Sequence, residues 1–130
     1  MGNTVICMAY INRLEQLKRT MAAYAKYGHK YSVIIANDGY EPLRRDDLPS
    51  MNGNGIIEIF DSDGVTEKTW HDPAIPMNKA LRYAINEMGA DTVILTNPEC
   101  MPVGDIIGDA ATVKQGEYRV YSCLSLDETI

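Results

Sequence analysis

Oxygen-bearing side chains follow an apolar run late in the sequence, in the stretch "VILTNPEC" at 93–100. Asn97 and Glu99 offer an amide and a carboxylate oxygen, which are ligand types that Mg²⁺ and Mn²⁺ accept in proteins. Pro98 stiffens the backbone between them and limits the directions in which both side chains can point. Two interpretations are open at this point: a polar turn that ends a strand, or a site that holds a ligand.

Three further apolar runs also end in polar residues. Because open parallel sheets bind ligands outside the carboxyl ends of their strands, we expect side chains from all four ends to converge on one crevice. Asp61 and Asp63 are spaced like the start of a calcium loop, but the glycine and the closing glutamate that such a loop needs are missing. The segments after these three runs are Ala9-Tyr10-Ile11-Asn12, Asn37-Asp38-Gly39 and Asp61-Ser62-Asp63.

Motifs that bind phosphate through a glycine-rich loop are missing. No G-x-G-x-x-G follows the first apolar run, and no G-x-x-x-x-G-K-[ST] occurs in the chain. Either motif would have indicated a nucleotide held by backbone N–H groups. A bound phosphate would therefore need another counter-charge, and a divalent cation held by Glu99, with Asn97 as a neutral helper, is the candidate.

The elements that must position these side chains alternate along the chain. Apolar runs predict buried strands at 4–10, 31–36, 55–60 and 91–96, and a more alternating run predicts a fifth strand at 118–126. Asn12 as N-cap and Glu15 three residues later form a capping box that begins a helix ending near Gly28. Apolar spacing predicts a second helix at 76–88 and a short third one within 103–116.

This pattern predicts an α/β fold with a mostly parallel sheet flanked by helices on both faces, in a Rossmann-like arrangement. The crossovers between strands should be right-handed. A chain of 130 residues is long enough for one hydrophobic core and too short for two ordinary domains. We therefore expect a single domain spanning 1–130.

Composition narrows the class of protein. The net charge is −6, and the basic residues Arg44 and Arg45 are followed at once by two aspartates, which argues against a nucleic-acid partner. No apolar run approaches the roughly 18 residues of a transmembrane helix, and the N-terminus lacks a signal-peptide pattern. We expect a cytoplasmic protein without a membrane span, whose three widely separated cysteines are reduced and pack as small apolar groups.

The two histidines offer weaker candidates for chemistry. His71, between Trp70 and Asp72, is interpreted mainly as an ordinary loop histidine, with sugar stacking or acid–base chemistry as the alternative. His29 directly follows Gly28 and is expected to interact with the carboxyl-terminal end of the first helix dipole.

Four segments together carry a resemblance to a known family. In chain order they are "MAYINRLEQLKRTM", "NDGY", "DPAIPMNKAL" and "NPECMPVGDII". The whole chain resembles the nucleotide-sugar-binding half of a GT-A glycosyltransferase of the family 2 type. The first segment stands where that family has P-x-Y-N-R, the second where it has D-D-G-S, and the last where it has D-x-D, for which some members carry N-P-E-C. The third resembles the N-P-x-x-x-N segment upstream in those members.

The resemblance implies a role for each matching residue. Ala9, Tyr10 and Asn12 would line the nucleoside pocket, with Asp38 reading the base and Asn37 beside it. Asn78 would face the diphosphate or the sugar. The metal, Mn²⁺ or Mg²⁺, would be held by Asn97 and Glu99, and the activity implied is transfer of a sugar, of the hexosyltransferase type, from a nucleoside diphosphate to an unknown acceptor.

Two departures from the family pattern keep alternatives open. Asn97 replaces the first aspartate of D-x-D, which removes one negative metal ligand. The chain also ends at Ile130, where the family's acceptor-binding half begins, and no match to its general base occurs; further chain or a homo-oligomer would have to complete the site. The alternatives are a truncated or repurposed GT-A domain acting as a non-catalytic binding or assembly module, and a nucleotidyltransferase or other nucleotide-binding α/β domain.

Overall fold

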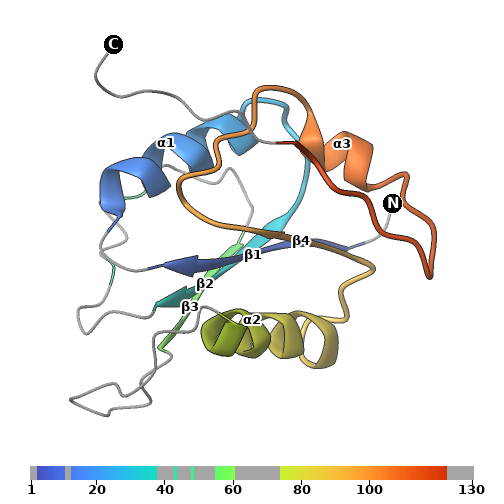
Figure 1. Ribbon diagram of the computed structural model, residues 1–130, viewed down its shortest axis with the longest axis horizontal. Coiled ribbons are helices and arrows are strands. Elements are labelled where there is room, and N and C mark those ends of the chain that lie inside the picture. Colours follow the sequence, from blue (N-terminus) through green and yellow to red (C-terminus); the bar gives the residue numbers. More distant parts are fainter. Residues whose placement is uncertain are drawn as a thin grey trace.

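The computed structural model describes residues 3–10, 13–37, 43, 48, 55–60 and 74–122 (Figure 1). Strands and helices alternate over most of this part of the chain. In order, the elements are β1 (Thr4–Tyr10), α1 (Leu14–Ala25), β2 (Ser32–Asn37), β3 (Gly55–Phe60), α2 (Ala74–Asn86), β4 (Thr92–Thr96) and α3 (Ile106–Ala110).

The strands form one four-stranded sheet in the order β3-β2-β1-β4, and every neighbouring pair is parallel. In the register, Tyr10 at the end of β1 is opposite Asn37 of β2, and Met8 is opposite Thr96 of β4. The chain builds outward from β1 to β2 and β3, and then returns to place β4 on the other side of β1. The α/β class and the parallel sheet are confirmed, and this order is compatible with a Rossmann-like arrangement.

Helices cover both faces of the sheet (Figure 1), with α1 and α3 on one side and α2 on the other. Alternate side chains of β1 point to opposite faces, as the period of a strand requires. Ile6 and Met8 pack with α1 and α3, whereas Val5 and Cys7 pack with α2. The continuous apolar run at 4–10 predicted a strand that is covered on both faces, and β1 is such a strand.

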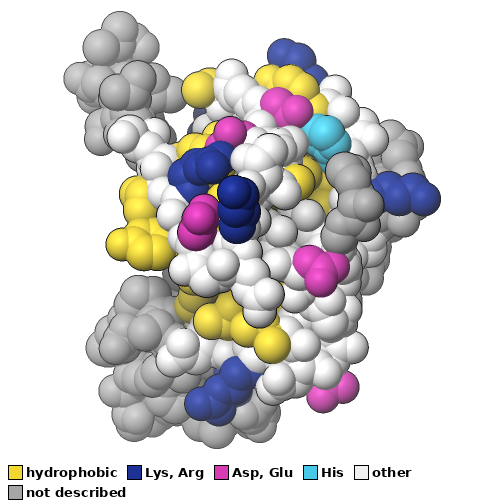
Figure 2. All heavy atoms as spheres, turned by 90° about the vertical axis from the view of Figure 1, so that its right-hand side faces the viewer, with side chains coloured by type: hydrophobic (Ala, Val, Ile, Leu, Met, Phe, Trp, Pro, Cys, Tyr) yellow, Lys and Arg dark blue, Asp and Glu magenta, His cyan; other side chains and the backbone are white. Residues whose placement is uncertain are grey.

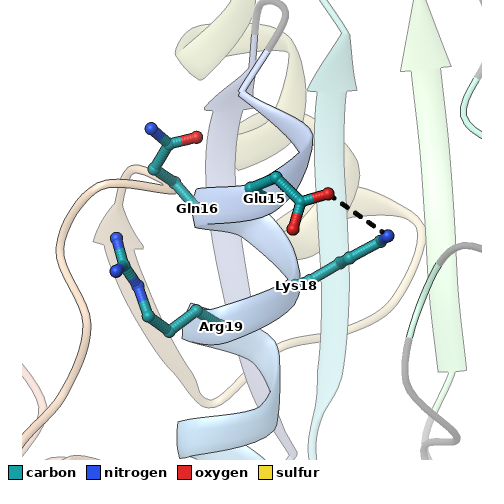
Figure 3. Close-up of a pocket in the computed structure, with 4 residues that line it drawn as sticks. All are labelled: Glu15, Gln16, Lys18 and Arg19. Atoms are coloured by element: carbon teal, nitrogen blue, oxygen red, sulfur yellow. Dashed lines mark hydrogen bonds and ion pairs between the residues drawn. The ribbon is translucent and has the colours of Figure 1, made fainter.

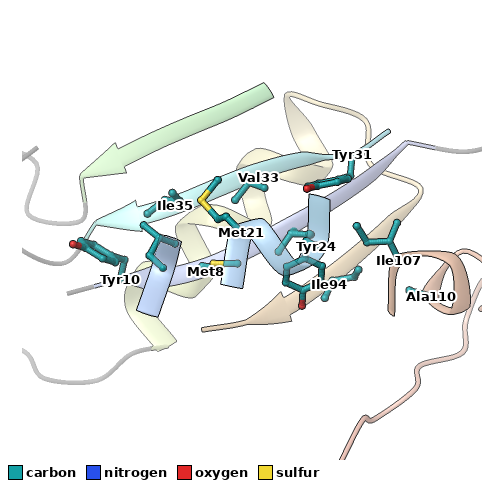
Figure 4. Packing of buried hydrophobic residues seen from close by; sticks show 12 residues of the cluster. Met8, Tyr10, Met21, Tyr24, Tyr31, Val33, Ile35, Ile94, Ile107 and Ala110 are labelled. Atoms are coloured by element: carbon teal, nitrogen blue, oxygen red, sulfur yellow. The ribbon is translucent and has the colours of Figure 1, made fainter. Parts of the chain in front are cut away.

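The face of α1 that meets the sheet carries Leu17, Met21 and Tyr24, which lie on one side of the helix because they are spaced by four and three residues. Figure 4 shows these aromatic and aliphatic side chains between the helix and the strands. The rings of Tyr24 and Tyr31 lie 6.5 Å apart between centroids in a tilted arrangement. On the opposite face, burial raises the pKa of the Cys7 thiol to about 12, in keeping with the expected packing role.

Two details of the predicted elements are wrong. No strand forms over 118–122; Tyr118 and Val120 are largely exposed, while the side chains of Arg119 and Tyr121 bind Asp109 of α3. These polar anchors hold the segment against a helix instead of a strand edge, and 123–126 lie outside the described residues.

The start of the first helix also differs from the prediction. Asn12 lies outside the described residues, and Arg13 occupies the N-cap position of α1 without a side-chain cap. The N–H of Leu17 donates to the carbonyl of Arg13, which shifts the start of the helix by one residue relative to the predicted capping box. Glu15 instead forms an ion pair with Lys18, in which Nζ of Lys18 lies 3.5 Å from Oε1 of Glu15. Within the described part of the chain, no helix is long and apolar enough to cross a membrane.

The buried face of α1 should dominate stability. We expect Leu17→Ala to lower the free energy of unfolding by about 2–5 kcal/mol, because it leaves a cavity under a fully buried side chain. Ile85→Ala on α2 is the matched control: this side chain is 52% exposed, so its loss should cost much less. Urea unfolding followed by circular dichroism measures both; equal losses would contradict this packing.

Candidate functional site

The carboxyl ends of β1 and β4 lie side by side at the point where the strand order reverses. The chain leaves β1 toward α1 on one face of the sheet, whereas it reaches β4 from α2 on the other face (Figure 1). Ligands of open α/β sheets bind outside the carboxyl ends of the strands, at the point where the strand order reverses. The residues placed there are Arg13, which follows β1, and the Asn97-Pro98-Glu99 segment, which follows β4.

The segment after β4 forms a tight turn. The N–H of Cys100 donates to the Asn97 carbonyl at 3.2 Å, and the N–H of Glu99 donates to Oδ1 of Asn97 at 3.2 Å. An asparagine side chain that accepts from the backbone two residues later stabilises such a turn. The turn interpretation is therefore confirmed, and it sets the relative position of the two predicted metal ligands without excluding a ligand.

Thr20 of α1 forms a hydrogen bond with this turn. Its hydroxyl donates to the Pro98 carbonyl at 2.6 Å, and both residues are buried. The bond joins the middle of α1 to the loop after β4, across 78 positions of sequence. Sequence reasoning missed Thr20, although a threonine directly beside Met21 on the buried face of a helix is a signal that its hydroxyl has a specific acceptor.

Glu99 forms an ion pair with Arg13. Nε of Arg13 lies 3.2 Å from Oε1 of Glu99, and the two side chains are 54% and 48% exposed. The pair connects the residue that begins α1 with the loop after β4, and so spans the ends of β1 and β4. Arg13 was not among the predicted site residues; the arginine of the "INRL" segment was the available signal.

The predicted nucleoside-pocket residues occupy the ends of β1 and β2. Ala9 is half-buried, and Tyr10 is buried in the cluster under α1. Figure 4 shows Tyr10 at the strand-end side of that cluster, with its hydroxyl directed away from the other labelled side chains. Asn37, opposite Tyr10 in the register, is fully buried. Asp38 lies outside the described residues, as does Asn12.

Asn78 belongs to a different layer of the molecule. It lies in the first half of α2, is exposed to solvent, and α2 covers the face of the sheet opposite α1. The structure thus brings Asn97 next to Glu99, and Tyr10 next to Asn37, but places Asn78 on the other helix layer.

The oxygen donors after β4 suit a hard divalent cation in chemical type. Glu99 offers one carboxylate and Asn97 one amide oxygen, a set that Mg²⁺ or Mn²⁺ completes with water and phosphate oxygens. Within the described ranges, no group of three or more His, Cys, Asp or Glu side chains is arranged to hold a metal. The residues present therefore fit a cation that a phosphate ligand shares, rather than a cation enclosed by protein side chains alone.

A shallow hollow lies on the outer face of α1 (Figure 3). Its lining comes from one exposed helical surface, so it cannot enclose a ligand as a crevice between elements can. We therefore place the candidate site at the strand ends and not in this hollow. The lining residues are Glu15, Gln16, Lys18 and Arg19.

A separate group of polar contacts stabilises α3. Nε2 of His29 lies 2.9 Å from each carboxylate oxygen of Asp105, which is the N-cap of α3 and accepts from the N–H of Gly108 at 3.0 Å. A Cβ at position 108 would collide with that carboxylate, which is why a glycine suits the turn. His29 is thus bound to the N-cap residue of α3, and its interaction with the dipole of the first helix stays a prediction.

The second carboxylate of α3 anchors the segment that follows the helix. Asp109 accepts from Arg119 at 2.8 Å and from the Tyr121 hydroxyl, and these hydrogen bonds hold the pKa of the Asp109 carboxyl below its usual range. Acidic and basic side chains lie close together on this face of the molecule, with a histidine beside an acidic group (Figure 2). Asp109 and Arg119 neutralise each other, which favours a structural role for this pair.

Comparisons with protein-family models, with curated proteins and with solved structures give no match for this chain. The family resemblance of the sequence motifs therefore stays a prediction.

The Thr20–Pro98 hydrogen bond gives a test of how the turn is held. Thr20→Val keeps the shape of the side chain but leaves the buried Pro98 carbonyl without its donor, so we expect a loss of about 1–3 kcal/mol in unfolding free energy. Thr112→Val is the matched control, because the Thr112 hydroxyl also donates to a backbone carbonyl at 2.6 Å, but in an exposed position where water can replace it. Urea unfolding compares the two; a larger loss for Thr112→Val would contradict the proposed role.

The N-cap of α3 predicts an acid-sensitive contribution to stability. Hydrogen bonds from His29 and from the N–H of Gly108 lower the pKa of the Asp105 carboxyl. Because the folded-state pKa is lowered, the stabilisation is fully present above the ordinary value and is lost as the pH falls below about 4. Asp105→Asn keeps a capping oxygen without the charge, so its melting temperature should fall less steeply with pH in that window. Parallel melting curves for variant and wild type would contradict this linkage.

Proposed function

We propose that this chain is a GT-A-like domain, related to family 2 glycosyltransferases, that binds a nucleoside-diphosphate sugar for transfer to an acceptor. The observation that carries the proposal is the turn after β4: it places Asn97 and Glu99 at the reversal point of a parallel sheet. The four motif-like segments named above occur in the family's order along the chain, which also supports the assignment.

In this proposal, the nucleoside lies over the ends of β1 and β2, near Tyr10 and Asn37, and the diphosphate extends toward the end of β4. A divalent cation, Mn²⁺ or Mg²⁺, would be held by Glu99 and Asn97 and would supply positive charge to the departing diphosphate. Glu99 must then turn away from Arg13. Oδ1 of Asn97 would still accept the hydrogen bond from the N–H of Glu99 through one lone pair, and its second lone pair would face the cation.

Calorimetry with uridine and guanosine diphosphates, with and without Mn²⁺, tests the proposal. For wild type we expect binding that Mn²⁺ strengthens, and for Glu99→Ala the Mn²⁺-dependent part of the affinity should be lost. Glu87→Ala is the matched control, because Glu87 is an exposed carboxylate just after α2, where the chain approaches the start of β4. Failure of both nucleotides to bind under every condition would refute the proposal.

A non-catalytic binding or assembly module is the second candidate. It is favoured by Asn97 standing where the family has an aspartate, because an amide contributes no negative charge to a metal site. The two candidates differ in turnover. Without an acceptor, a transferase slowly hydrolyses the nucleoside-diphosphate sugar by transferring the sugar to water, whereas a binding module leaves it intact. Chromatography of a nucleoside-diphosphate sugar after prolonged incubation with the protein and Mn²⁺ distinguishes them.

A further inference from the structure

We propose that Arg13 is a diphosphate-binding residue of this site, and that its ion pair with Glu99 exchanges for two new partners when ligands bind: the diphosphate for Arg13 and the cation for Glu99. This inference rests on the proposed function and adds to it a role for Arg13, to which the family resemblance assigned none, and an order of events.

The first argument is position. Arg13 is the N-cap of α1, while Glu99 lies in the turn after β4, so the 3.2 Å contact between Nε of Arg13 and Oε1 of Glu99 spans the reversal point. A ligand entering between the ends of β1 and β4 would meet this pair. Thr20 holds the turn that carries Glu99 through the buried bond to Pro98, so the backbone on the β4 side is anchored to the same helix that Arg13 begins.

The second argument is chemistry. The chain has no glycine-rich phosphate loop, so a diphosphate needs side chains or a cation to balance its charge. A guanidinium matches phosphate oxygens in a bidentate geometry. Glu99 contacts Nε of Arg13, the guanidinium has two further terminal nitrogens that can donate, and the side chain is 54% exposed. Arg13 can therefore reach a phosphate with little rearrangement.

The third argument is magnitude. An ion pair with half-exposed partners contributes little to stability because water screens both charges, so exchanging it changes an affinity by at most about five-fold. A diphosphate offers Arg13 more charge than a single carboxylate, and a divalent cation offers Glu99 more than a guanidinium. Each ligand also releases the partner that the other one needs, so diphosphate and cation should bind cooperatively, and the coupling must be equal in both directions.

The experiment measures uridine diphosphate binding to the full chain by calorimetry, first with chelator and then with Mn²⁺, and Mn²⁺ binding alone. With chelator, Arg13→Gln should weaken nucleotide binding about ten-fold, the loss expected for a charge-assisted hydrogen bond. Glu99→Gln should strengthen it by up to about five-fold, because Arg13 is released. Mn²⁺ alone should bind Arg13→Gln more tightly than wild type, because Glu99 is released.

Three controls make the result specific. Arg82→Gln removes an exposed arginine from the second half of α2 and should change none of these affinities. Arg13→Lys should restore part of the nucleotide affinity, because it keeps the charge without the bidentate geometry. In the double variant Arg13→Gln/Glu99→Gln, the gain from Glu99→Gln should vanish, which separates release of Arg13 from a general loss of negative charge. Circular dichroism checks that each variant folds.

The outcomes separate this inference from the proposed function. If wild type binds uridine diphosphate and Arg13→Gln binds it as tightly as Arg82→Gln does, the role of Arg13 is refuted while the proposed function stands. If Glu99→Gln weakens cation-free binding, Glu99 positions Arg13 instead of competing for it, and the exchange is refuted. If wild type binds no nucleotide under any condition, the proposed function and this inference both fail.

Discussion

Strand β1 forms backbone hydrogen bonds on both sides, with β2 and with β4, while helices cover both of its faces. The rest of the described structure depends on this double constraint. Over residues 5–9, β1 carries only apolar side chains, as expected for a strand that is covered on both faces. Arg13 and Glu99 of the candidate site therefore lie at the carboxyl edge of the sheet, where the start of α1 and the turn after β4 meet.

The candidate site combines one strong contact with one weak contact. The buried bond between Thr20 and Pro98 fixes the backbone of the turn, because breaking it would leave a carbonyl without a partner away from water. The exposed pair of Arg13 and Glu99 can exchange partners at little cost. A rigid backbone that carries exchangeable charged side chains suits a binding site for an anionic ligand, since the site stays in place while its charges rearrange.

Most of the fold could be predicted from local sequence patterns, and the errors have physical causes. Apolar runs predicted all four strands with bounds correct to within one residue, because short continuous apolar runs are typical of strands in a parallel sheet. The predicted fifth strand failed because alternation alone does not say what pairs with a segment: Arg119 and Tyr121 bind Asp109 of α3 instead. The predicted capping box failed by one residue, since Arg13 took the cap position.

The sequence by itself determined the α/β class and the presence of Asn97 and Glu99 after a buried strand, because both follow from local composition and order along the chain. Only the tertiary structure decided that β4 lies next to β1, that Arg13 reaches Glu99, and that Thr20 of α1 supports Pro98. These contacts join residues more than seventy positions apart, and no local pattern encodes them. They arise when the sheet and its helices pack, since packing alone brings the ends of distant strands to the same edge.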